Sequence, residues 1–269
     1  MIVDFHTHCF PDALAPRAMA ALSRNAATLG MNPFTDATLS DNEAHLRRAG
    51  VTHFVVCNIA TNPRQQTNVN SFAIELTKRG DHIHPLGSLH PDGEGFEGEI
   101  LRLKAAGIKG LKLHPDYVGV EVDDPRFMRL FELCERNGLF AVIHAGFDPV
   151  SPEHMHAPPR AIHKVLERFP SLTLIAAHMG GPLVAREVLD VLVGTPVYLD
   201  TSLSSTRAEE KEALWEILQR HDPDRLLLGS DTPWSSAERE IAFVREAPIS
   251  ESTRRKILWG NAARLLGLA

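Results

Sequence analysis

The sequence predicts an α/β fold, a closed (β/α)8 TIM barrel, on three observations. Eight short apolar runs resemble strands, and each is followed by an amphipathic helical pattern, with about 25–35 residues per unit. The runs are almost continuously apolar, as expected of parallel strands covered on both faces. A chain of 269 residues is long enough for one such barrel. We therefore expect a single barrel domain over residues 1–269.

The predicted elements alternate along the whole chain. Strands are expected at 2–8, 52–59, 83–89, 109–114, 139–144, 172–178, 196–201 and 225–231. Helices are expected at 38–49, 65–79, 96–107, 125–137, 158–169, 182–193, 207–221 and 236–246. Glycine follows the ends of several helical patterns, at Gly50, Gly80, Gly107 and Gly138. Asp124 before Pro125 is a typical helix start.

Three further segments complete the predicted fold. Residues 9–37 and 145–158 are long connections that leave the carboxyl ends of strands, where barrel active sites lie, so we expect them to form the mouth and a lid. Residues 250–269 are predicted as a C-terminal helical extension packed on the barrel exterior. The alternative, an open doubly wound sheet, would need a glycine-rich phosphate loop after the first strand, and that loop is absent from the sequence.

The composition excludes several classes of protein. With 43% hydrophobic and 23% charged residues, the chain is globular rather than disordered or fibrous. No apolar run is long enough to span a membrane, and a strand begins at residue 2 with no basic leader. A net charge of -6 argues against nucleic acid and anionic membranes as partners. Three scattered cysteines predict a reducing, cytoplasmic location, and the oligomeric state, homo-oligomer included, is left open.

Histidine and aspartate close several of the predicted strands. His6 and His8 end the first strand and share one face, because side chains alternate along a strand. His144, His178 and Asp231 end the fifth, sixth and eighth strands. A barrel brings the carboxyl ends of its strands together, so we expect these five side chains to form one cluster at its mouth.

Such a cluster is suited to a divalent transition metal. Imidazoles and a carboxylate favour zinc, with manganese, iron and nickel as alternatives. A metal with an open position activates water near neutral pH, and Asp231 is placed to take and return the proton. His154 and His156 lie in the predicted lid, and the sequence does not decide whether they contact substrate.

The same residues lie in motifs that resemble the amidohydrolase superfamily, specifically its amidohydrolase-related group of metal-dependent hydrolases and nonoxidative decarboxylases. The motifs are DFHTH at 4–8, GLKLHP at 110–115, VIHAG at 142–146, AHMGG at 177–181 and LLLGSDTPW at 226–234. The resemblance implies that His6, His8, His144 and Asp231 hold one metal. It also implies that His178 holds a second metal or orients the attacking water.

The fourth strand leaves the number of metals open. Lys112 resembles a lysine that is carboxylated in some relatives and bridges two metals. The alternative is an unmodified Lys112 one layer deeper in the barrel, with His114 facing the metal or the substrate. We expect one tightly held metal and leave the second open.

The reaction expected first is hydrolysis of an amide, lactone or ester of a small molecule. The alternative is decarboxylation of a carboxylated phenolic or enoic substrate, which requires a cationic clamp such as Arg64 or Arg160. Trp234, after the eighth strand, is an aromatic side chain expected to contact substrate. A metal-independent lactone hydrolase and a barrel that only binds its ligand are further alternatives, which the intact ligand positions disfavour.

Overall fold

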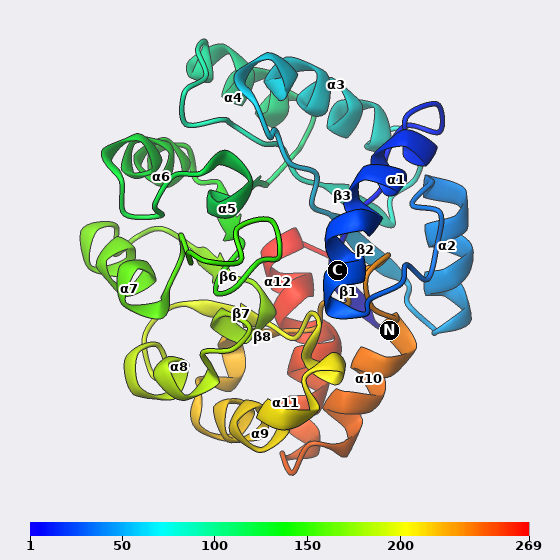
Figure 1. Cartoon of the computed structure of the whole chain (residues 1–269), viewed down its shortest axis with the longest axis vertical. Coiled ribbons are helices and arrows are strands. Elements are labelled where there is room, and N and C mark those ends of the chain that lie inside the picture. The colour runs from blue at the N-terminus through cyan, green and yellow to red at the C-terminus, as the bar shows by residue number, and fades with distance from the viewer. Residues whose placement is uncertain (269) are drawn as a thin grey trace.

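The computed structural model describes residues 1–268, with the backbone alone for Leu29, and it contains the predicted barrel (Figure 1). Within these residues the strands are β1 Val3–Thr7, β2 His53–Val56, β3 Ile83–Pro85, β4 Gly110–Leu113, β5 Phe140–Ile143, β6 Leu174–Ala176, β7 Tyr198–Asp200 and β8 Leu226–Leu227. All neighbouring pairs are parallel, in the orders β1-β2-β3 and β4-β5-β6-β7-β8. The strands are shorter than predicted, since most of them end before the last residues of the predicted runs.

Backbone hydrogen bonds join the two sheets at both seams. Between β3 and β4, the amide of Lys112 donates to the carbonyl of Gly87 at 2.8 Å. Between β8 and β1, the amide of Phe5 donates to the carbonyl of Leu228 at 2.7 Å. These contacts bring the eight strands into one ring, as the alternating sequence pattern predicts.

Helices surround the strands (Figure 1). They are α1 Ala15–Ala26, α2 Leu39–Arg48, α3 Gln66–Leu76, α4 Phe96–Ala105, α5 Pro115–Val118, α6 Pro125–Asn137, α7 Pro159–Arg168, α8 Ala185–Val191, α9 Lys211–Arg220, α10 Ala237–Glu246, α11 Glu251–Arg255 and α12 Asn261–Leu266. The predicted capping residue Asp124 accepts from the amide of Arg126 at 2.8 Å. Gly138 follows α6 at φ +66°, a left-handed conformation that favours glycine.

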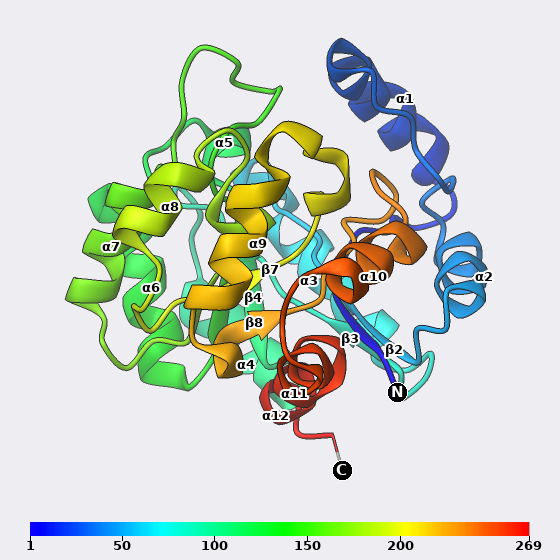
Figure 2. The same ribbon diagram turned by 90° about the horizontal axis from the view of Figure 1, so that it is seen from below.

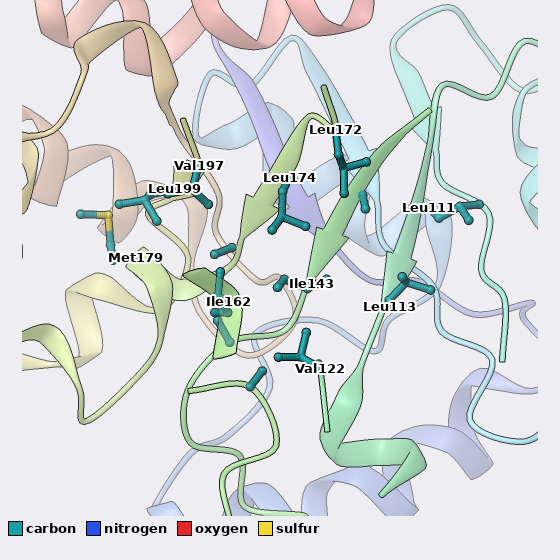
Figure 3. Packing of buried hydrophobic residues seen from close by; sticks show 14 of the residues in the cluster. Leu111, Leu113, Val122, Ile143, Ile162, Leu172, Leu174, Met179, Val197 and Leu199 are labelled. Carbon is teal, nitrogen blue, oxygen red and sulfur yellow. The ribbon is translucent and has the colours of Figure 1, made fainter. Parts of the chain in front are cut away.

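Two apolar layers hold the barrel together. Inward-facing residues of the strands, among them Val55, Val142 and Ile175, form an interior cluster. The alternate residues pack outward against the helices, and Figure 3 shows part of this layer around Ile143 and Leu174. Because both faces of every strand are buried, the strands read as continuous apolar runs in the sequence.

The C-terminal helices differ from the prediction of exterior packing. α12 contacts β1 and β8, and its residues Ala262 and Leu266 belong to the interior cluster. These two side chains lie one helical turn apart on one face, so α12 covers the amino end of the barrel (Figure 2). Residue 269, the last of the predicted extension, lies outside the described residues. Among the described residues, no helix combines the length and the hydropathy that crossing a membrane requires.

Candidate metal centre

Three of the predicted ligands meet at the carboxyl end of the barrel. One donor atom from each of His6, His8 and Asp231 lies within 4.8 Å of the others. Asp231 Oδ1 is 3.0 Å from His8 Nε2 and 3.5 Å from His6 Nε2. His6 and Asp231 are buried, and His8 is partly buried. The strand alternation that placed His6 and His8 on one face therefore agrees with their position in the structure.

An irregularity in β1 turns His6 into the barrel. Phe5 belongs to the interior cluster, yet the next side chain, His6, also points inward, and the pairing of β1 with β2 shifts register between Asp4 and Thr7. Asp4 Oδ1 accepts from the amides of His6 at 3.1 Å and Ser230 at 2.9 Å, which fastens this irregular turn to the loop after β8. Burial raises the pKa of Asp4 to about 7.

Asp200, at the end of β7, completes the cluster and was not among the predicted site residues. Its Oδ2 lies 2.9 Å from His6 Nδ1, and its Oδ1 accepts from the amides of His178 at 3.1 Å and Ser202 at 3.0 Å. A carboxylate here keeps the proton of His6 on Nδ1 and leaves the lone pair on Nε2, the nitrogen that faces Lys112 and Asp231. The signal was present in the sequence, since Asp200 closes an apolar strand in the same way as Asp231.

His144 and His178 form the other half of the site. His178 Nε2 lies 3.1 Å from His144 Nδ1, and the rings of His6 and His178 stack with centroids 5.2 Å apart. Ser202 Oγ lies 2.8 Å from His178 Nδ1. The five predicted side chains are thus connected, through direct contacts and through Asp200, into one group.

Two glycines allow the loops after β5 and β6 to approach. Gly146 has φ +75° and Gly181 has φ +132°, conformations that favour glycine. A β-carbon on Gly146 would lie 2.3 Å from the α-carbon of Gly181, so the two backbones are in direct contact. Because these glycines follow His144 and His178, their contact sets the spacing of the two imidazoles.

Burial keeps four imidazoles of the site uncharged. It lowers the pKa of His144, and it lowers those of His6, His114 and His178 well below the ordinary value. A neutral imidazole offers a lone pair to a cation, so this donor set fits a divalent transition metal.

Lys112 is buried in the barrel next to His6, a position that both interpretations of the sequence allow. Its side chain is 1% exposed, and Nζ lies 3.0 Å from His6 Nε2. Burial lowers the pKa of the Lys112 amine. The amine faces the same lone pair of His6 that a metal would use, which makes Lys112 a direct neighbour of any bound cation.

A wall of the site is formed by His114 and by Asp148 from residues 145–158. The His114 and His144 rings stack with centroids 4.1 Å apart. Asp148 Oδ2 lies 3.4 Å from His114 Nε2 and 3.6 Å from His144 Nε2. Sequence reasoning missed Asp148, because a loop of unknown path gives no basis for placing an aspartate next to a strand end.

The predicted clamp residues lie away from these contacts. Arg160 is on α7, with a side chain 77% exposed, and its Nε is 3.3 Å from Glu187 Oε1. Arg64 is exposed on a short turn before α3. Trp234 is half-buried, and its amide donates to the carbonyl of Asp231 at 2.7 Å, so its position next to the site agrees with a substrate contact that stays a prediction.

A parallel barrel with buried histidines and aspartates at the carboxyl ends of its strands defines a class of metal-dependent enzymes. The chain belongs to the amidohydrolase family, whose model matches residues 3–268. It is therefore an enzyme of the amidohydrolase superfamily, whose members bind divalent metals.

Named relatives extend the comparison. A decarboxylase of 2-amino-3-carboxymuconate-6-semialdehyde from Dictyostelium discoideum is 26% identical over 197 residues, which cover 60% of this chain and 54% of the relative. A TIM-barrel protein of Bordetella bronchiseptica superposes with a TM-score of 0.79 at 23% identity, covering 99% of this chain and 98% of the other. 5-Carboxyvanillate decarboxylase LigW from Sphingomonas paucimobilis superposes with a TM-score of 0.72 at 18% identity, covering 100% and 99%. The two structural likenesses show the barrel fold.

Proposed function

We propose that this enzyme is a metal-dependent, nonoxidative decarboxylase of a small carboxylated substrate with a phenolic or enoic group. The observation that carries the proposal is a buried histidine–aspartate centre in a chain that resembles a curated decarboxylase in sequence. The structural likeness to a second decarboxylase supports it. These relatives favour decarboxylation over the hydrolysis that the sequence analysis placed first.

The residues of the site have distinct roles in this proposal. His6, His8, His144 and Asp231 would hold the metal, with zinc expected and manganese, iron and nickel as alternatives. When bound, the divalent cation supplies the positive charge that attracts the substrate carboxylate and an adjacent oxygen. Asp200 holds His6 in the tautomer that such binding requires.

The bond change is simple and needs a proton donor at carbon. The bond between the substrate carbon and its carboxylate breaks, carbon dioxide leaves, and the electron pair stays on the carbon. Asp231 takes a proton from a substrate hydroxyl or from water and delivers it to that carbon. Asp231 is 5% exposed, so bulk water has little access to this residue before it delivers the proton.

Hydrolysis is the second candidate, because a specific observation favours it. Neither Arg64 nor Arg160 contacts the cluster, and Arg160 pairs with Glu187 on the surface. Neither arginine would therefore clamp a carboxylated substrate, whereas an uncharged lactone or amide would need no arginine clamp.

A substrate panel separates the two reactions. The zinc- or manganese-loaded enzyme is incubated with carboxylated phenols and enoic acids in one arm, and with lactones and N-acyl compounds in the other. Release of carbon dioxide in the first arm, absent with Asp231→Asn, supports the proposal. Turnover of the second arm alone, with no carbon dioxide from any acid, would replace it with hydrolysis.

A further inference from the structure

Another group of side chains that could bind a metal lies outside the catalytic cluster, where residues 145–158 meet Glu121. One donor atom from each of Glu121, His154 and His156 lies within 4.8 Å of the others. Glu121 follows α5, and the two histidines come from residues 145–158, which rise beyond α5 at the mouth of the barrel (Figure 2). From this geometry we propose a separate zinc site that ties the lid to the turn between α5 and α6.

The donor set and its spacing suit zinc. Glu121 Oε1 contacts His154 Nε2, and the His154 and His156 rings meet at 88° with centroids 4.5 Å apart. Two imidazoles and one carboxylate are a zinc ligand set that leaves a fourth position for water. Two of these side chains are more exposed than those of the catalytic cluster, at 60% for His154 and 44% for Glu121, and the side chain of His156 is 13% exposed. Zinc can therefore reach them from solvent.

A buried carboxylate already orients one of the proposed ligands. Asp116 on α5 has a fully buried side chain, and its Oδ1 lies 3.0 Å from His156 Nδ1. This contact occupies Nδ1 and leaves Nε2 as the nitrogen that can bind a metal, which is the usual arrangement around a protein-bound zinc. Among the described residues Asp116 Oδ2 has no hydrogen-bond partner, so the carboxylate has further capacity to support a positively charged centre.

Hydrogen bonds already fasten the segment around His154, at Ser151 and at His156. The amide of Val122 donates to the carbonyl of His156 at 2.9 Å, and Ser151 Oγ donates to Asp116 Oδ1. The same segment carries Asp148, which lies next to His114 and His144. Zinc would join His154 to the anchored His156. It would thereby hold the segment that carries Asp148 in the wall of the catalytic site.

Zinc counting tests the proposal on the full chain. The protein is dialysed against saturating zinc, excess metal is removed, and zinc per chain is measured for the wild type, for His154→Gln and for His163→Gln. His163 is a matched control, because it is a surface histidine 3.7 Å from Glu167 with 38% exposure. We expect the wild type and His163→Gln to bind one equivalent more than His154→Gln. Equal counts in wild type and His154→Gln would overturn the proposal.

Two further measurements separate a zinc site from a simple ion pair. Asp116→Asn should weaken binding of this additional zinc by about 10–100-fold, since the orienting carboxylate loses its charge. Zinc should also slow cleavage at Glu153 by a glutamate-specific protease in the wild type and in His163→Gln, and not in His154→Gln. Cleavage that is equally fast with and without zinc in the wild type would show that the metal does not fasten the lid.

Discussion

Replacing Asp200 with asparagine tests the role of the carboxylate beneath the proposed metal. The two oxygens of Asp200 have different partners: Oδ1 accepts from the amides of His178 and Ser202 and from the Ser202 hydroxyl, and Oδ2 faces only His6 Nδ1. In Asp200→Asn the amide oxygen will stay with the larger group of donors. The new NH2 group then faces His6 Nδ1, which must give up its proton to accept.

The tautomer change has a calculable consequence for the metal. With the proton moved to Nε2, which lies 3.5 Å from Asp231 Oδ1, His6 loses the lone pair that would bind the metal. Loss of an orienting carboxylate of this type weakens metal binding by about 10–100-fold. That factor corresponds to about 1.4–2.7 kcal/mol. The barrel itself should persist, because the replacement has nearly the same volume and Oδ1 keeps its donors.

Competition with a chromophoric chelator measures the zinc affinity, and thermal unfolding of the metal-free proteins reports on the fold. Asp4→Asn is the matched control, since Asp4 is equally buried and lies two residues from His6, but its Oδ1 accepts from two backbone amides, which the asparagine oxygen can keep. We expect its zinc affinity to stay within about threefold of the wild type. Wild-type affinity in Asp200→Asn, or an equal loss in Asp4→Asn, would refute the tautomer argument.

Three other outcomes follow from the site and the core. Asp231→Asn should lower kcat by about 10²–10⁴-fold with an unchanged melting temperature, because the proposed proton carrier is lost. Retained turnover would assign proton transfer to another residue. Burial raises the pKa of Glu240 to about 8 from an ordinary value near 4.5, so the folded state holds this proton more tightly than the unfolded chain. This stabilisation is complete below about pH 4.5 and is lost as the pH rises to 8. In urea unfolding, the wild type should therefore lose up to about 4 kcal/mol of its free energy of unfolding between pH 5 and pH 8, relative to Glu240→Gln. Parallel pH profiles of the two proteins would contradict the shift. Gly110→Ala places a β-carbon 2.3 Å from the Phe140 ring. This variant should lower the free energy of unfolding by about 1–3 kcal/mol. An unchanged denaturation midpoint would disprove the expectation.

The barrel was predictable because its elements have strong periodic signals. Apolar runs buried on both faces, and helix ends such as Asp124 and Gly138, mark the alternation of strands and helices directly in the sequence. The position of α12 was not predictable in the same way. Its short apolar face fits either the outside of the barrel or its amino end, and only the closed ring leaves an uncovered interior that Ala262 and Leu266 can fill.

The predicted cluster followed from one rule, that polar residues at the ends of parallel strands converge. Applied consistently, the rule would also have included Asp200. Other features depend on tertiary structure that no local pattern encodes. The register shift in β1 that turns both Phe5 and His6 inward arises from pairing with β2, and Asp148 reaches the site only through the path of its loop.

The contact between Gly146 and Gly181 means that the catalytic geometry depends on positions that carry no functional group at all. A mutational survey restricted to titratable side chains would pass over them. A single methyl group at either position would push two neighbouring loops apart and separate imidazoles whose own chemistry is untouched. Efforts to redesign this enzyme for new substrates should therefore leave the contact between these two glycines unaltered and vary other residues of the 145–158 segment instead.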